Sequence, residues 1–379
     1  DKDKYKSAQT AMDIVLGRGG DQAVIRQNDI YKFFGGRAQE VEKRTKVKAR
    51  VVAHALENLI KESSKVMVMG HSNPDIDAMG SAIGIYRLAK SLNKNAYIIT
   101  SDRPTLQNFR ESLLEEPEYE DVLISKEVAE ENIDEDTLLV VVDTHKINYV
   151  ESEEVLKKAN KIVIIDHHRR SADYIENATL TFQEVYASSA AELVTELLQY
   201  TEVNVELKKI EAEALYAGIM MDTKSFTFKT GVRTFEAAAY LRKCGVDIIR
   251  VKKWFQSDLE SFNKIAEIVK KAEIVNDSIA IAICDDQKSK DISLLCAKAA
   301  DELLTISDVT ASFVLGNTGE KICISGRSIG DINVQVILEK LGGGGHITLA
   351  GAQVEGMTME EAKQELIIRI NEYFTEIEN

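Results

Sequence analysis

The sequence predicts an α/β protein whose parallel-sheet domain is followed by a smaller α/β domain. Four short apolar runs rich in β-branched residues occupy 66–70, 96–100, 138–143 and 161–166. Helical patterns separate them, and continuous apolar strands that alternate with helices are typical of a parallel sheet covered on both faces. After about residue 269 the pattern changes to strand pairs, a glycine run and a closing helix, which indicates a second hydrophobic core.

Five segments are predicted along the chain. Residues 1–37 contain two short strand patterns (22–27 and 31–36), too few to bury a core, and therefore indicate the tail of another domain. Residues 38–63 predict a connector helix. The parallel-sheet domain spans 64–245, a helical linker 246–268 and the smaller domain 269–379. Further helices are expected at 79–93, 151–159, 187–200, 208–221 and 234–274.

Within the smaller domain, strands are expected at 274–284, 309–317 and 321–328, the last two forming a hairpin. Helices are expected at 334–341 and 359–374, with a glycine loop between them at 342–346. Near the N-terminus, GRGGD (17–21) can be interpreted as a phosphate loop or as a hairpin turn. No GKS or GKT follows it, which favours the turn.

Charge and composition exclude several classes of protein. The 379 residues include 47 Lys and Arg against 62 Asp and Glu, a net charge of −15, which suits a long nucleic-acid groove poorly. Residues 1–50 differ, with 12 basic and 7 acidic side chains. No apolar run approaches the ~20 residues of a membrane span, and no signal peptide is recognisable, so a cytoplasmic location is expected. The four cysteines lack metal-binding spacing and are expected to be reduced.

Acidic residues and histidines follow three of the four predicted strands. The first strand runs into HSNPDIDAMGSA (71–82), the third into DTH (143–145) and the fourth into DHH (166–168). Ligands of open parallel sheets bind outside the carboxyl ends of the strands, so these clusters are expected to meet at one edge. Four of the six histidines lie in these clusters. Of the other two, His346 follows the four glycines, and His54 is expected to be solvated on the connector helix.

The residue types in these clusters favour a metal site. A fourth acid, Asp222, ends the helical segment ALYAGIMMD. Several aspartates on one edge would repel one another, and two divalent cations would neutralise them. Carboxylates with imidazoles suit manganese, whereas structural zinc sites prefer cysteine and histidine. A pair of metal ions can activate water and hold a phosphoryl group.

The smaller domain offers groups that bind anions. Arg327 ends a predicted strand in SGRS (325–328), and a guanidinium can hold a phosphate through two hydrogen bonds. GGGGH (342–346) presents backbone N–H groups suited to an anion. Each feature alone is compatible with an ordinary surface arginine or a plain flexible loop. Together they predict a substrate-binding domain for a phosphate-containing ligand.

These motifs resemble those of the DHH phosphoesterase family. HSNPDIDAMGSA, VDTH (142–145), DHH and AGIMMDT (217–223) are similar to its first, second, namesake and fourth motifs. SGRS and GGGGH resemble the DHH-associated domain of the RecJ, NrnA and GdpP branches, although Leu349 replaces the first alanine of the usual continuation. The likeness covers about 64–379.

The N-terminal part narrows the resemblance to one branch. AMDIVLGRGGDQAV (11–24) is similar to the end of the degenerate GGDEF domain of GdpP-type cyclic-di-AMP phosphodiesterases. Such proteins also carry two transmembrane helices and a PAS domain. The resemblance therefore implies a cytoplasmic fragment of a parent anchored in the cell membrane, and a homodimer is compatible with it.

The resemblance also implies roles for individual residues. One metal ion would be held by His71, Asp75 and Asp143. The second would be held by Asp77, Asp143, His167 and Asp222. Asp143 thus bridges the two ions, His168 touches the phosphate or lies just behind the ligands, and Asp166 is a structural partner of the histidines. His145 receives no role. The substrate would be bound by Ser325, Arg327, Gly342, Gly343, Gly344, Gly345 and His346.

The activity implied is hydrolysis of cyclic di-AMP to linear 5′-pApA by water activated at two manganese ions, with other divalent metals as substitutes. The main alternative is an NrnA-like oligoribonuclease and pAp phosphatase, which shares every motif from residue 64 onward. A RecJ-like exonuclease fits the acidic composition poorly, and a family II pyrophosphatase would end in a different domain. A nucleotide sensor with an inactive site is disfavoured because the set of metal ligands is complete.

Overall fold

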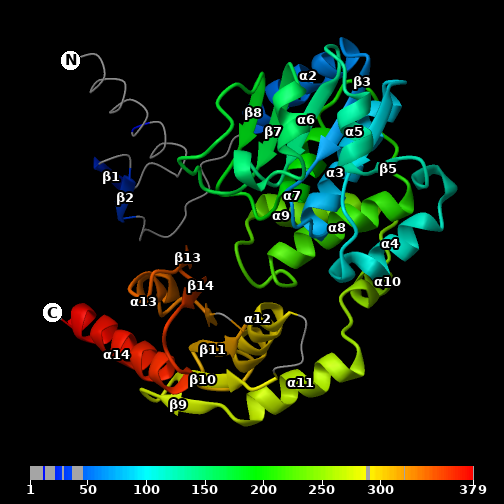
Figure 1. Ribbon diagram of the computed structural model, residues 1–379. Coiled ribbons are helices and arrows are strands. Elements are labelled where there is room, and N and C mark those ends of the chain that lie inside the picture. Colours follow the sequence, from blue (N-terminus) through cyan, green and yellow to red (C-terminus); the bar gives the residue numbers. More distant parts are fainter. Residues whose placement is uncertain are drawn as a thin grey trace. The chain divides into compact units, whose positions relative to one another are not determined.

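The computed structural model describes Met12 and residues 22–27, 30–35, 46–286, 291–319 and 321–378 (Figure 1). The chain forms two compact units, residues 1–255 and 256–379. The GRGGD segment and the first part of the expected connector helix, up to residue 45, lie outside the described residues. The two expected N-terminal strands are present as an antiparallel hairpin of β1 (Gln22–Gln27) and β2 (Ile30–Gly35).

The first unit contains the predicted parallel sheet, with the strand order β5-β4-β3-β6-β7-β8. The four apolar runs form β3 (Lys65–Met69), β4 (Asn95–Ile99), β6 (Leu138–Val142) and β7 (Lys161–Asp166). The short edge strands β5 (Leu123–Ile124) and β8 (Leu180–Gln183) were not predicted, because neither has a continuous apolar run. The strand order reverses between β3 and β6, which is where ligands bind in sheets of this topology.

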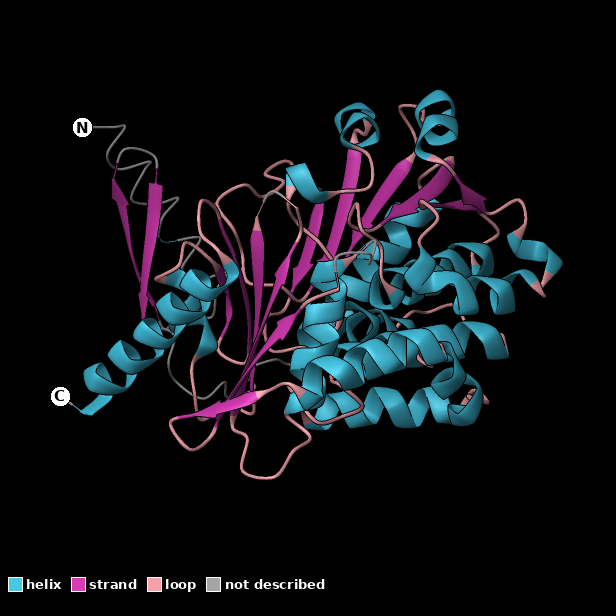
Figure 2. Ribbon diagram, turned by 60° about the horizontal axis from the view of Figure 1, so that its bottom comes forward, coloured by secondary structure: helices cyan, strands magenta, loops and turns pink. Residues whose placement is uncertain are grey.

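Helices cover both faces of this sheet (Figure 2). Alternate residues of the strands point to opposite faces, so Val66 and Val68 enter one core while Met67 and Met69 enter the other. The first core contains residues of α2 (Lys46–Lys61), α3 (Ile76–Ser91), α4 (Gln107–Leu114), α7 (Ala190–Leu198), α8 (Lys209–Asp222), α9 (Val232–Lys243) and α10 (Ile248–Trp254). The second contains residues of α5 (Lys126–Asn132) and α6 (Glu153–Lys158).

Glycines allow helix α3 to approach α8 unusually closely. A Cβ atom at Gly80 would lie 2.4 Å from the backbone oxygen of Ala214, and one at Gly84 would lie 2.6 Å from a methyl group of Val194 on α7. Real side chains do not tolerate such distances, so these positions require glycine. The close approach places the start of α3 directly beside the end of α8, and both of these helix ends carry acidic residues of the predicted site.

The second unit contains a mixed six-stranded sheet in the order β13-β14-β12-β11-β10-β9. Its strands are β9 (Glu273–Val275), β10 (Ile279–Cys284), β11 (Ala311–Asn317), β12 (Ile322–Ser328), β13 (Gly344–His346) and β14 (Leu349–Val354). Its helices are α11 (Leu259–Lys270), α12 (Ile292–Leu303), α13 (Val334–Glu339) and α14 (Met359–Glu378). Two cores lie on this sheet, one with α13 and α14 and the other with α11 and α12.

Several expectations for this part of the chain were wrong in detail. The run 274–284 is two antiparallel strands, because Asn276 and Asp277 adopt positive φ and turn the chain. The helical stretch 234–274 is three helices. The glycine run is a loop only in its first part, since Gly344–His346 pairs with β14 as an edge strand. The predicted hairpin of β11 and β12 is confirmed.

All four cysteines are free thiols. Among the described residues, no helix combines the length and the apolar character that crossing a membrane requires.

Candidate metal centre

The three polar clusters meet at the carboxyl ends of β3, β6 and β7, as predicted. Asp75 caps α3: its carboxylate accepts hydrogen bonds from the backbone N–H groups of Asp77 and Ala78 at 2.9 and 3.0 Å. The cap holds the loop after β3 in place, so that His71 and Asp75 both face β6. Their neighbour Asp77 points into the helical layer instead, where it is fully buried.

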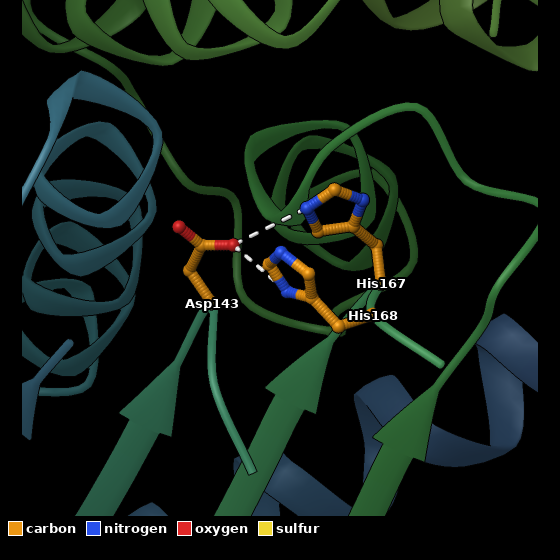
Figure 3. A group of neighbouring side chains, drawn as sticks. All are labelled: Asp143, His167 and His168. Carbon is orange, nitrogen blue, oxygen red and sulfur yellow. Dashed lines mark ion pairs between the residues drawn. The ribbon is translucent and has the colours of Figure 1, made fainter. Parts of the chain in front are cut away.

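Asp143 lies at the centre of the site. It follows β6 with φ of 59°, a left-handed conformation that is uncommon outside glycine and that aspartate adopts more readily than most residues. Its Oδ2 lies 3.3 Å from His71 Nε2, and its Oδ1 lies 3.3 Å from His167 Nε2. His167 and His168 directly follow the adjacent strand β7, and both rings point toward the Asp143 carboxylate (Figure 3). The two oxygens of one carboxylate thus face two different groups of side chains.

The first group consists of His71, Asp75 and Asp143, whose donor atoms lie close enough together to share one cation. The Nε2 of His71 is 3.7 Å from Asp75 Oδ2. The second group consists of Asp77, His167 and Asp222. There, His167 Nε2 lies 3.1 Å from Asp222 Oδ2 and 3.9 Å from Asp77 Oδ2. Joined by Asp143, these two groups bring together the residues that the family resemblance implied as ligands of two metal ions, and their binding of metal stays a prediction.

Burial and mutual repulsion shift the pKa values of these groups strongly. Burial raises the pKa of Asp77 well above its usual range, and the charges of Asp143 and Asp222 raise it further. Burial alone would lower the pKa of His71, but contacts with Asp143 and Asp75 outweigh it and raise the pKa to about 10. The pKa of His167 is raised in the same way, against its burial, by Asp143 and Asp222. His71, Asp77 and His167 therefore hold protons more tightly than free side chains do, at positions where a cation could bind instead.

The buried polar atoms of the site fit divalent metal ions. His167 Nε2 and Asp143 Oδ1, which both face the other donor atoms, are buried without a hydrogen-bond partner. Buried polar atoms are normally satisfied, and a metal ion is one of the partners that can satisfy them. Each group supplies carboxylate oxygens and one imidazole, a donor set that manganese accepts.

Asp166 is occupied by other partners. It is completely buried and contacts both His145 and His168, with His168 Nδ1 at 2.8 Å from Asp166 Oδ1. Burial would raise its pKa, but these two histidines hold the pKa well below the usual range. The His168 ring is also 3.6 Å from Asp143 Oδ1, and its side chain is 46% exposed. His168 is therefore the histidine of the DHH motif that is open to a ligand.

Two neighbours of His71 were not singled out from the sequence. The Tyr149 ring stacks on the His71 ring, with centroids 5.1 Å apart and planes at 1°. Arg103 donates from Nη2 to the backbone oxygen of Ser72 at 2.6 Å, which places a cation beside the acidic cluster. Neither residue belongs to a strand-end motif, and only the folding of two loops against β3 brings them here. His54, in contrast, is half-exposed on α2, as expected.

In the second unit, Arg327 is 7% exposed and already engaged. Its Nε donates to Asp301 of α12 at 3.1 Å, and its Nη1 donates to the backbone oxygen of Gly326 at 2.9 Å. Ser325 lies two residues earlier on β12 and therefore shares a face with Arg327. The predicted phosphate contacts of both side chains stay predictions.

The glycine run has a packing role that its sequence did not reveal. A Cβ atom at Gly343 would lie 2.3 Å from the backbone oxygen of Gly351, and one at Gly345 would lie 2.4 Å from that of Leu349. These two glycines therefore let β13 approach β14. A Cβ atom at Gly344, in contrast, would meet no other atom within 4 Å, so packing does not require glycine there.

Comparison with known proteins agrees with this architecture. Residues 65–219 match the N-terminal domain of the DHH family, and residues 276–376 match the DHHA1 domain. The two matched segments make up more than half of the chain, which therefore belongs to the DHH family.

Curated relatives share much of the sequence. Over 372 residues the chain is 48% identical to the cyclic-di-AMP phosphodiesterase GdpP of Geobacillus thermodenitrificans, a match that covers 97% of this chain and 56% of the relative. The chain thus spans little more than half the length of that protein. The bifunctional oligoribonuclease and PAP phosphatase NrnA of Thermus thermophilus is 26% identical, over 86% of this chain and 95% of the relative.

A solved structure has a similar fold. An exopolyphosphatase-related protein from Bacteroides fragilis superposes with a TM-score of 0.75 at 20% identity, covering 90% of this chain and all of that one. This likeness supports the arrangement of strands and helices described above.

Proposed function

We propose that this chain hydrolyses cyclic di-AMP to linear 5′-pApA with two divalent metal ions, preferably manganese. The observation that carries the proposal is the pair of donor groups that share Asp143. His71 and Asp75 would bind one ion, and Asp77, His167 and Asp222 the other. Two such ions supply an activated water and neutralise charge on the phosphoryl group.

Different side chains would set the spacing of the donor groups and bind the phosphates of the substrate. Asp143 sets the spacing of the two donor groups, because one carboxylate contacts both histidines. The exposed ring of His168 would contact the phosphate that reacts. Arg327, Ser325 and the segment Gly342–His346 would bind phosphate oxygens of the dinucleotide, with backbone N–H groups supplementing the guanidinium.

Sequence similarity favours the cyclic dinucleotide over short linear RNA. The chain is 48% identical to a cyclic-di-AMP phosphodiesterase but 26% identical to an NrnA protein that matches over nearly its whole length. The alternative activity on pAp and short oligoribonucleotides uses the same domains, so it is tested beside the proposed one.

The decisive experiment is product analysis with purified, metal-reconstituted chain. Cyclic di-AMP, cyclic di-GMP, pApA and pAp are incubated separately with saturating manganese or magnesium, and products are separated by chromatography. We expect cyclic di-AMP to be converted to pApA fastest, with manganese superior to magnesium because magnesium demands rigid octahedral geometry. Faster turnover of pApA or pAp than of the cyclic substrate would favour the alternative. An Asp143→Asn variant controls for contaminating nucleases.

A further inference from the structure

His145 is buried in the first unit, yet it is neither a member of the two donor groups joined by Asp143 nor close to the surface. Only 2% of the residue is exposed. Its Nδ1 contacts Asp166 Oδ2 in a short hydrogen bond. Its Nε2 lies 2.9 Å from the backbone N of Ser171 and 3.0 Å from the Ser171 hydroxyl oxygen. Both ring nitrogens are therefore used within the protein.

These contacts identify the tautomer of His145. A backbone N–H can only donate, so Nε2 must accept the hydrogen bond from Ser171 and cannot carry a proton. The proton of the neutral ring is then on Nδ1, where it is donated to the Asp166 carboxylate. The Gln183 amide nitrogen is 3.3 Å from Nδ1, but it donates to the backbone oxygen of His168 at 2.8 Å. The carboxylate is thus the acceptor for the Nδ1 proton.

The second oxygen of Asp166 holds His168. Oδ1 accepts hydrogen bonds from the His168 backbone N–H at 3.1 Å and from His168 Nδ1 at 2.8 Å. Because Asp166 is completely buried, water cannot replace a lost partner, and the orientation of its carboxylate depends on the hydrogen bonds that it accepts. With Nδ1 of His168 engaged, Nε2 is the ring nitrogen left for a ligand, and this side chain is 46% exposed.

We propose that His145 is a positioning residue: as the Nδ1–H tautomer it holds Asp166, which in turn orients the His168 ring with its Nε2 free to contact the phosphate substrate. The hydrogen-bonded path runs from the Ser171 backbone through His145 and Asp166 to His168. Its last step, contact with a phosphate, rests on the proposed function, whereas the arrangement of the three side chains does not.

The tautomer is tested without any activity measurement. The full chain is labelled with ¹⁵N-histidine, stripped of metal, and its ring nitrogens are observed by NMR spectroscopy, with His145→Ala and His145→Asn used for assignment. We expect the His145 ring to have an unprotonated Nε2 and a protonated Nδ1. We also expect the ring signals of His168 to shift in His145→Ala. A protonated Nε2, or His168 signals unchanged in that variant, would overturn the proposal.

Kinetics of the metal-loaded chain test the consequence for His168. His145→Ala should lower kcat for cyclic di-AMP roughly ten- to a hundredfold, the effect of losing one hydrogen bond to a charged group, with KM nearly unchanged. His145→Asn should recover part of this loss, because its amide can donate from about the position of Nδ1. Equal activity of the Ala variant and the unaltered chain would overturn the proposal, as would an Asn variant no better than Ala.

A matched control uses His54, which is half-exposed on α2 and distant from this path in the sequence. His54→Ala should change neither the NMR signals of His168 nor kcat. Metal content and melting temperature are measured for every variant, so that loss of the fold is recognised. If the unaltered chain does not cleave cyclic di-AMP, the proposed function fails, and the NMR experiment still decides the tautomer of His145.

Discussion

Gly218 of α8 lies so close to Asp77 of α3 that a Cβ atom at position 218 would be 2.7 Å from Asp77 Oδ1. The same carboxylate accepts hydrogen bonds at 2.8 Å from the backbone N–H groups of Ala190 and Ala191, at the start of α7. Three helices therefore meet at one buried carboxylate. The missing side chain at Gly218 is what lets Asp77 remain both buried and directed at His167.

Substitution of Gly218 should disturb both stability and metal binding. In Gly218→Ala the new methyl group would also lie 2.8 Å from the Ala191 Cβ, so Asp77 or α7 must move. We expect a loss of about 1–3 kcal/mol in the free energy of unfolding, as for other overpacked sites. We also expect weaker binding of one of the two metal ions, measured by elemental analysis after dialysis at limiting manganese.

Gly84→Ala is the matched control, because it introduces a similar clash into α3 against Val194 without touching Asp77. It should lower the free energy of unfolding and leave metal content unchanged. Normal stability and normal metal content in Gly218→Ala would contradict the packing described here.

The shared carboxylate of Asp143 can be separated experimentally from His168. Asp143→Ala removes a contact to both His71 and His167, whereas His168→Ala leaves both donor groups intact. We expect metal content near zero in the first variant, near normal content in the second, and very low turnover in both. Asp136→Ala, an exposed acid before β6, serves as the control for loss of one negative charge. Two tightly bound ions and normal turnover in Asp143→Ala would show that the assignment is wrong.

The metal-stripped chain should be least stable at high pH. The pKa of His71 is raised to about 10, despite its burial, by contacts with Asp143 and Asp75. Because the folded chain binds this proton more tightly than the unfolded chain does, the resulting stability is complete below the usual histidine pKa of about 6.5 and is lost as the pH rises toward 10. The raised pKa of Asp77 acts in the same direction.

Calorimetry between pH 7 and 10 measures this effect. We expect the melting temperature of stripped protein to fall by several degrees over that range, and the slope to be smaller in His71→Gln. Bound manganese should protect the protein better as the pH rises, because metal ligands must be deprotonated. A melting temperature of stripped protein that is constant or rises with pH would be inconsistent with these shifted groups.

Arg327 is expected to act in substrate binding and not in metal binding. A bidentate, charge-assisted contact between arginine and phosphate is worth about 1.5–3 kcal/mol. Arg327→Ala should therefore weaken productive binding of cyclic di-AMP roughly ten- to a hundredfold and leave metal content unchanged. The loss should appear mainly in KM if the guanidinium holds the phosphate that does not react.

Two further variants sharpen this test. Arg327→Lys keeps the charge but not the forked donor geometry, and should recover only part of the affinity. Lys298→Ala removes an exposed cation of α12 and should have little effect. A fall in kcat alone would place Arg327 at the reacting phosphate. Unchanged KM and kcat would exclude it from the substrate site.

Prediction from sequence succeeded where a short segment carries its own signal. The apolar runs that form β3, β6 and β7 are continuous and contain β-branched residues, and each is followed by acids and histidines of the site. Prediction from sequence failed where a segment becomes a strand only because another strand pairs with it. Gly344–His346 is a strand only because β14 pairs with it, and β14 itself consists largely of small residues without a clear strand pattern.

By itself, the sequence determined the α/β class and the set of side chains at the carboxyl edge, because strand-end position and residue type are local properties of the chain. Only the tertiary structure decided how those side chains are distributed between the two donor groups. The reversal of strand order between β3 and β6 places Asp143 between His71 and His167, and the left-handed backbone of Asp143 turns one oxygen toward each. The same holds for His145, because its role depends on which atoms its two ring nitrogens meet, and those atoms come from segments 21 and 26 residues away.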